Sequence, residues 1–345
     1  MAAPGLDVRS LLSREPSIYV YRMRMRSRWK QVRYRLEWIG LILTTKLVPL
    51  LPRKGCFHLA NALGLLISIF DRRGRKVALS NLELAFGNTL SVRQRRKVVR
   101  ESFQHFARTM LDLLWSSRLN RENFSRYIEK QNFEETARGT GPECSFIMAT
   151  YHYSNFEWLS MACAYSGKTG TIVAQEFKNS LLDPIFRKIR ERCGHEFIPR
   201  ERGIVRLYKV LRRKGTTALL VDLTIPPTQG AVPIDCFGLK TSVTSAHAWL
   251  HQRTGTPIIP AHCEPLPGGR YRVVFHPKIA NTGTMTLQQI AQACWESFEP
   301  YVRKNPAPWL WMYKHWRYRP TNADRPYPFY AHIYEAFDEI LKENL

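Results

Sequence analysis

Acidic residues are scarce in this sequence of 345 residues. There are 28 Asp and Glu against 52 Lys and Arg, which gives a formal net charge of +24. A positive field of this size attracts polyanions, either nucleic acid or anionic lipid headgroups. A generally basic, soluble surface is the plainer interpretation, but the charge is unevenly distributed along the chain.

Paired cysteines are also lacking. The seven cysteines are scattered along the chain, and none forms a CxxC motif. This pattern argues against a disulfide framework and against a zinc site, and it fits a reducing compartment. We therefore expect no bound metal, and we expect most of the cysteines to be small core residues. The sequence also has no internal repeat and no low-complexity segment, and its 44% of apolar residues predict a globular body.

No apolar run is long and clean enough to span a bilayer, which takes about 18–20 residues. Residues 22–35 carry seven basic side chains and no acidic one. The apolar stretch 36–51 follows directly, interrupted by Glu37 and Lys46, and a second stretch covers 56–70. There is no small-residue cleavage site of the kind that ends a signal peptide.

These features predict a membrane-associated segment over residues 1–75. Pro49 and Pro52 break any helix between the two apolar stretches. We expect a helical pair that inserts into or lies on a membrane, with the basic residues on the cytoplasmic side. Two alternatives are buried core helices and an arginine-rich arm for nucleic acid. The basic run adjoins the apolar runs, which favours the membrane-associated interpretation over both alternatives.

The rest of the chain, residues 76–345, alternates strand and helix patterns. Expected strands cover 144–150, 171–175, 216–221, 256–261 and 271–275. Expected helices cover 155–165, 181–193, 203–214, 243–254, 286–303 and, at the end of the chain, 328–345. Capping boxes mark the start of the 286–303 helix, at Thr286 with Gln289, and of one further helix, at Ser91 with Gln94. This pattern predicts an α/β fold with a mostly parallel central sheet flanked by helices.

A histidine and a carboxylate follow the first of these strands. His152 and Glu157 are five positions apart, and neutral histidine is the usual general base near pH 7. Glu157 can hold the tautomer of the imidazole if His152 lies on a loop and Glu157 on the first helical turn. Ser154 or Asn155 is suited to cap that helix. By itself this spacing is a weak motif, and a structural histidine is the default.

Three other residues are candidates for the substrate site. Arg200 is suited to bind a phosphate through bidentate hydrogen bonds, although a surface arginine is common in so basic a chain. Asp222 ends an apolar strand, where it is either a site residue or a simple strand-end cap. Asn155 lies between His152 and Glu157.

In their order along the chain, these features resemble one family, the bacterial lipid A biosynthesis acyltransferases (the lauroyl and myristoyl transferases). That family belongs to the glycerolipid acyltransferase superfamily, which has an H-x4-D/E signature. The resemblance extends from about Glu37 to Pro320. The segments that carry it are Leu51-Pro52, Asn81 to Phe86, His152/Asn155/Glu157, Phe197 to Arg200, Phe237-Gly238, Thr254 to Pro260 and Trp311 to Pro320.

The resemblance implies that residues 76–345 form an α/β acyltransferase domain. It implies transfer of an acyl chain from acyl carrier protein or coenzyme A to a lipid hydroxyl, at the cytoplasmic face of the inner membrane. His152 would be the base and Glu157 its partner, while Arg200, Asp222 and Asn155 would bind substrate. No bound cofactor is expected. The partners implied are anionic membrane lipid, acyl carrier protein and a lipid acceptor.

Several residues depart from the family pattern. The family commonly has Gly-Asn-Trp-Glu after the histidine, where this chain has Ser-Asn-Phe-Glu, and Asp-Gln where this chain has Asp222-Leu223. Residues 173–176 lack an arginine that lipid A enzymes often carry there. The acceptor is therefore open between a lipid A precursor, which is favoured, a lysophospholipid and another glycolipid.

A nucleic-acid-binding protein is the rival from another class. It would use the arginine run and the aromatic cluster Trp309, Trp311, Tyr313, Trp316 and Tyr318, whose rings are also suited to a membrane interface or to the core face of a strand. The sequence has no recognisable nucleic-acid-binding signature, so we expect no nucleic-acid partner.

Overall fold

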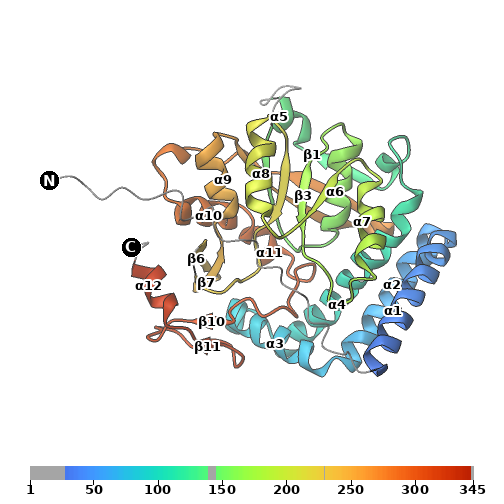
Figure 1. Ribbon diagram of the computed structural model, residues 1–345. Coiled ribbons are helices and arrows are strands. Elements are labelled where there is room, and N and C mark those ends of the chain that lie inside the picture. The colour runs from blue at the N-terminus through green and yellow to red at the C-terminus, as the bar shows by residue number, and fades with distance from the viewer. Residues whose placement is uncertain (1–27, 139–144, 229, 343–345) are drawn as a thin grey trace.

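The computed structural model describes residues 28–138, 145–228 and 230–342 (Figure 1). Residues 22–27 of the basic run and Cys144 therefore lie outside the described residues. The other six cysteines are buried and free, as the sequence predicts.

A seven-stranded sheet forms the centre of the molecule (Figure 1). Its strands, in spatial order, are β1 (Ile128–Gln131), β9 (Arg270–Phe275), β8 (Ile258–Leu266), β2 (Ile147–Thr150), β5 (Thr217–Leu220), β3 (Thr171–Ala174) and β4 (Glu196–Pro199). Strands β8, β2, β5, β3 and β4 run parallel to one another. Strand β9 runs antiparallel to β8, and β1 pairs with β9 in parallel. The predicted α/β fold with a mostly parallel sheet is confirmed.

Helices cover both faces of this sheet, and strand β2 shows why. All four of its residues are buried, with Ile147 and Ala149 in one apolar cluster and Met148 in the other. Alternate residues of a strand point to opposite faces, so the sheet has a core on each side. The flanking helices are α5 (Phe133–Arg138), α6 (Phe156–Tyr165), α7 (Asp183–Glu191), α8 (Gly203–Arg212), α9 (Ala246–Thr254), α10 (Leu287–Glu296) and α11 (Glu299–Lys304).

The N-terminal third is helical, with α1 and α2 at one edge of the molecule (Figure 1). Its helices are α1 (Arg28–Leu47), α2 (Arg53–Phe70), α3 (Arg72–Phe86) and α4 (Val92–Trp115). The break at the prolines and the Ser91–Gln94 capping box are as predicted. Helix α2 lies very close to α4, because a Cβ on Gly64 would come within 2.4 Å of the Gln104 Cα. None of the helices in the described ranges is long and apolar enough to cross a bilayer.

The largest differences from the predicted elements are near the C-terminus. The expected helix 286–303 is two helices, α10 and α11, with Pro300 in the first turn of α11, and the Thr286–Gln289 capping box is present. Within the described part of the expected helix 328–345, the helix is α12 (Ala336–Lys342), and the chain before it forms β11 (His332–Ile333) against β10 (Tyr318–Arg319). A hairpin, β6 (Ala231–Cys236) and β7 (Leu239–Thr244), was not predicted.

Candidate active site

The catalytic candidates lie at one edge of the central sheet. Strands β2, β4 and β5 are parallel, so their carboxyl ends share that edge. His152 follows β2, Arg200 follows β4, and Asp222 follows β5. In open α/β sheets this edge is where ligands bind.

The imidazole of His152 is held by Asp222. His152 Nδ1 lies 2.8 Å from Asp222 Oδ1, and the backbone N–H of His152 donates to Oδ2 at 2.9 Å. The indole N–H of Trp309 also donates to Oδ2, at 2.9 Å. The Asp222 side chain is fully buried, while that of His152 is 14% exposed. One carboxylate therefore fixes both the backbone and the ring of His152.

The charge on Asp222 determines which ring nitrogen carries the proton. Burial alone would raise the pKa of the Asp222 carboxyl, but His152, His315 and the Trp309 indole together lower it below its usual value. A charged carboxylate only accepts hydrogen bonds, so Nδ1–H of His152 is the donor. Nε2 then carries the free lone pair, and it has no hydrogen-bond partner within the described ranges. This is the tautomer that a general base needs.

Glu157 and His152 do not contact each other as predicted: His152 pairs with Asp222, and Glu157 pairs with Arg190. Glu157 lies on the first turn of α6 and accepts two hydrogen bonds from Arg190 of α7, at 3.0 Å to Nε and 2.5 Å to Nη2. Both side chains are largely buried. The carboxylate of the H-x4-E motif thus points to the neighbouring helix, and Asp222 occupies the position at Nδ1 that Glu157 was expected to take.

Asn155 is an N-cap and not an exposed group. Its Oδ1 accepts from the backbone N–H of Trp158 at 3.0 Å, and the residue is completely buried. The structure thus gives Asn155 a capping role at a buried position, and Asp222, which is also buried, contacts His152. Arg200 differs, because it is exposed at the end of β4, where a substrate anion can reach it.

A cavity of about 580 Å³ lies between the loop after β3, helix α7 and strand β4. Arg190 lines it and connects it to Glu157, five residues after His152. Its wall combines the rings of Phe177, Phe186 and Phe197 with basic side chains of α7. Such a mixed lining suits an amphipathic ligand. No group of three or more His, Cys, Asp or Glu within the described ranges is placed to hold a metal ion.

One family model covers most of the chain. The family model of the bacterial lipid A biosynthesis acyltransferases matches residues 22–318. The chain belongs to this family. It is therefore an O-acyltransferase, and its family acts on lipid A. A search of curated proteins found no match.

Two departures from the family pattern are now explained. Phe156, where these acyltransferases commonly have Trp, packs edge-to-face on the His152 ring at 4.9 Å between centroids. An aromatic ring therefore covers one side of the imidazole in this chain. Leu223, in place of Gln, directly follows Asp222 and leaves its hydrogen bonds to His152 intact.

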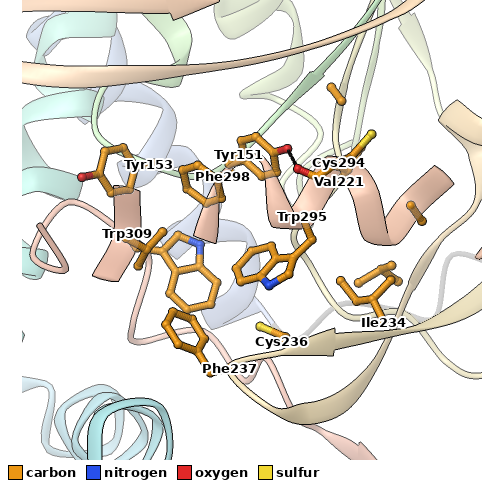
Figure 2. Packing of buried hydrophobic residues seen from close by; sticks show 14 of the residues in the cluster. Tyr151, Tyr153, Val221, Ile234, Cys236, Phe237, Cys294, Trp295, Phe298 and Trp309 are labelled. Carbon is orange, nitrogen blue, oxygen red and sulfur yellow. Dashed lines mark hydrogen bonds between the residues drawn. The ribbon is translucent and has the colours of Figure 1, made fainter. Parts of the chain in front are cut away.

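The aromatic cluster near residue 310 is core. Trp309, Trp311 and Trp316 are fully buried, so they are unavailable for stacking on bases or for contact with lipid. Figure 2 shows Trp309 beside Trp295 and Phe237, with Tyr151 and Tyr153 around Phe298. The Tyr151 ring stacks on Phe298 at 3.8 Å, and its hydroxyl donates to the Cys294 carbonyl. These contacts hold the residues on either side of His152.

Trp309 and Arg190 were missed as site residues. Trp309 stood in the sequence among other tryptophans, and nothing there singled out the one that reaches Asp222, 87 residues away. Arg190 was one of several basic residues of an amphipathic helix. No local signal distinguishes either one, because the partners come from distant elements.

Proposed function

We propose that this protein transfers a fatty acyl chain from a thioester, acyl carrier protein or coenzyme A, to a hydroxyl of a lipid A precursor. The observation that carries the proposal is the His152–Asp222 pair, which leaves Nε2 free at the carboxyl edge of the sheet. A base in this state needs no nucleophile from the protein, because the acceptor supplies the hydroxyl.

In the proposed reaction, Nε2 of His152 takes the proton of the acceptor hydroxyl as its oxygen attacks the thioester carbonyl. A C–O bond forms, the carbonyl oxygen carries the negative charge, and collapse of this intermediate breaks the C–S bond. The imidazolium returns the proton to the departing thiolate. Asp222 stabilises the imidazolium between these steps, because its carboxylate lies 2.8 Å from Nδ1.

The cavity beside α7 and the exposed Arg200 are the proposed substrate contacts. The phenylalanines of the cavity suit an acyl chain, and the basic groups at its rim suit the phosphate of a lipid A precursor. The net charge of +24 also suits the acidic acyl carrier protein.

The test is an acyl-transfer assay on purified full-length protein in detergent, followed by mass spectrometry of the lipid. We expect the lipid A precursor to gain the mass of one acyl chain, and parallel reactions with acyl carrier protein and coenzyme A thioesters to identify the donor. A lysophospholipid offered as acceptor covers the alternative substrate. Lack of transfer to any of these acceptors from either donor would refute the proposal.

Helix α1 is the proposed contact with the cytoplasmic face of the inner membrane. Seven large apolar side chains on it are more than a third exposed, namely Trp29, Val32, Leu36, Trp38, Ile39, Leu43 and Leu47. Exposed basic residues lie among them, including Lys30, Arg33, Arg35 and Lys46. An apolar surface with basic neighbours binds an anionic bilayer in two ways. The apolar side chains are buried in the bilayer, and the basic side chains are attracted to the anionic headgroups.

A vesicle-flotation measurement checks this surface. The wild type should float with vesicles rich in phosphatidylglycerol, and less so with purely zwitterionic ones, because the basic residues lose their partner. The double variant Leu36→Glu/Leu43→Glu should weaken flotation at least tenfold. Each substitution removes apolar burial in the bilayer that contributes on the order of 1–3 kcal/mol. Val92→Glu, which changes an exposed apolar residue at the start of α4, is the matched control. Equal flotation of the double variant and the wild type would exclude α1 as the membrane contact.

A further inference from the structure

Asp112, in helix α4, collects hydrogen bonds from three separate elements. It is 1% exposed. Its Oδ2 accepts from Arg53 Nη2 of α2 at 3.0 Å, from Asn155 Nδ2 at 3.0 Å, and from the Tyr271 hydroxyl of β9 at 2.6 Å. Arg53 Nη1 also donates to Oδ1. These four hydrogen bonds fill the acceptor capacity of the carboxylate and offset the cost of burying its charge.

The Arg53 side of this cluster is an anchor for helix α2. Arg53 Nε donates to the carbonyl of Gly269 at 3.1 Å, in the turn between β8 and β9. Its guanidinium also stacks over the Trp158 ring at 4.7 Å. Gly269 has a φ of +74°, which favours glycine, and a Cβ there would also crowd Arg53 Nη2 at 3.3 Å. Arg53 thus joins α2 to α4 and to the sheet.

The Asn155 side of the cluster leads to the catalytic turn, residues 152–155. Because Asn155 Oδ1 accepts the Trp158 N–H, its Nδ2 is directed at Asp112. One helical turn earlier on α4, the Thr109 hydroxyl donates to the Ser154 carbonyl at 2.8 Å. Ser154 has a φ of +50°, a left-handed conformation that needs support from its surroundings. Helix α4 therefore holds Ser154 and Asn155, two of the three residues between His152 and α6.

We infer that Asp112 is a positioning residue for acyl transfer: through Asn155 it sets the turn that carries His152, and through Arg53 it ties that turn to helix α2. This inference rests on the function proposed above. Tyr271 supports the arrangement, because burial and then the Asp112 charge raise the pKa of its hydroxyl, which stays protonated and donates. A small displacement of the turn moves Nε2 relative to the acceptor hydroxyl, and a shift of about 1 Å can cost about a hundredfold in rate.

Two variants test the link from opposite ends. Asp112→Ala removes both acceptor oxygens, while Asn155→Ser keeps an oxygen for the Trp158 N–H but is too short to reach Asp112. Each should lower kcat by about 10- to 100-fold with KM changed less than about twofold, because the binding groups are untouched. The kcat of the combined variant should lie within about threefold of the kcat of the more impaired single variant. The losses do not multiply, because both changes break the same contact.

Leu113→Ala is the matched control. Leu113 is the next residue on α4, fully buried and apolar, so its truncation destabilises the helix without touching the turn. Its kcat, measured below the unfolding temperature of every variant, should stay within about twofold of wild type. Asn155→Ser leaves the Arg53–Asp112 pair intact, so it decides the question even if Asp112→Ala fails to fold.

The outcomes separate this inference from the proposed function. Wild-type kcat in Asn155→Ser, or losses that multiply in the combined variant, would overturn the positioning role. If the wild type transfers no acyl chain, or if His152→Ala is as active as wild type, the proposed function itself fails. An active wild type, an inactive His152→Ala and a fully active Asn155→Ser would refute only the inference about Asp112.

Discussion

An Asp222→Asn enzyme is expected to lose about three to four orders of magnitude in kcat, nearly as much as His152→Ala. The reason is the hydrogen-bond pattern around the carboxylate. Oδ2 accepts from the backbone N–H of His152 and from the Trp309 indole, so an asparagine must place its oxygen there. Its NH₂ group then faces His152 Nδ1. The proton of the neutral imidazole moves to Nε2, which can no longer act as a base.

Steady-state kinetics across a pH series check this prediction. Because the tautomer is wrong at every pH at which the imidazole is neutral, raising the pH should not restore the rate. Asp235→Asn is the control, since Asp235 is a half-exposed carboxylate paired with Lys240 on the β6–β7 hairpin. It should keep wild-type kcat. An Asp222→Asn enzyme with kcat within threefold of wild type would show that Asp222 does not set the state of His152.

The arrangement that makes this prediction possible was only partly predictable from sequence. The strand before His152 and the helix after it follow from hydrophobic pattern and from an asparagine that can cap, and both lie where expected. The partner of His152 does not follow, because Asp222 is 70 residues away and reaches it through the pairing of β2 with β5. Local spacing favoured Glu157, but a side chain on the first turn of α6 faces α7.

The same distinction explains the errors in the fold. The capping boxes and the strands β2, β3, β5, β8 and β9 are local patterns, and they were predicted, whereas β1 and β4 were not. The β6–β7 hairpin was missed because its turn, Phe237-Gly238, has positive φ at both residues, and phenylalanine gives no turn signal. The final helix was predicted to start too early because the apolar residues of 329–341 have helical spacing throughout. Ile333 nevertheless lies in β11, where it pairs with β10.

Replacing Glu157 by glutamine is expected to lower the free energy of unfolding by about 3 kcal/mol. The change removes the charge that faces Arg190, whose side chain is only 18% exposed, and leaves a cation in the wall of the cavity without its counter-ion. Arg190 also lies 5.7 Å from the ring centroids of Phe186 and Phe197, so it cannot turn away to solvent without losing both contacts. Thermal or denaturant unfolding in detergent measures the loss. Glu101→Gln, which breaks an exposed pair with Lys97, is the control and should change stability by less than about 0.5 kcal/mol.

The kinetics of the same variants decide what Glu157 does. If Glu157 acts by holding Arg190 in the cavity wall, Glu157→Gln should raise KM more than it lowers kcat, and Arg190→Met should reproduce that effect. The combined variant Glu157→Gln/Arg190→Met should regain most of the lost stability, because no buried charge is left unpaired. A carboxylate that oriented the imidazole would behave differently: Glu157→Gln would lose kcat as severely as Asp222→Asn, and Arg190→Met would not. The ion pair at 2.5–3.0 Å leads us to expect the first pattern.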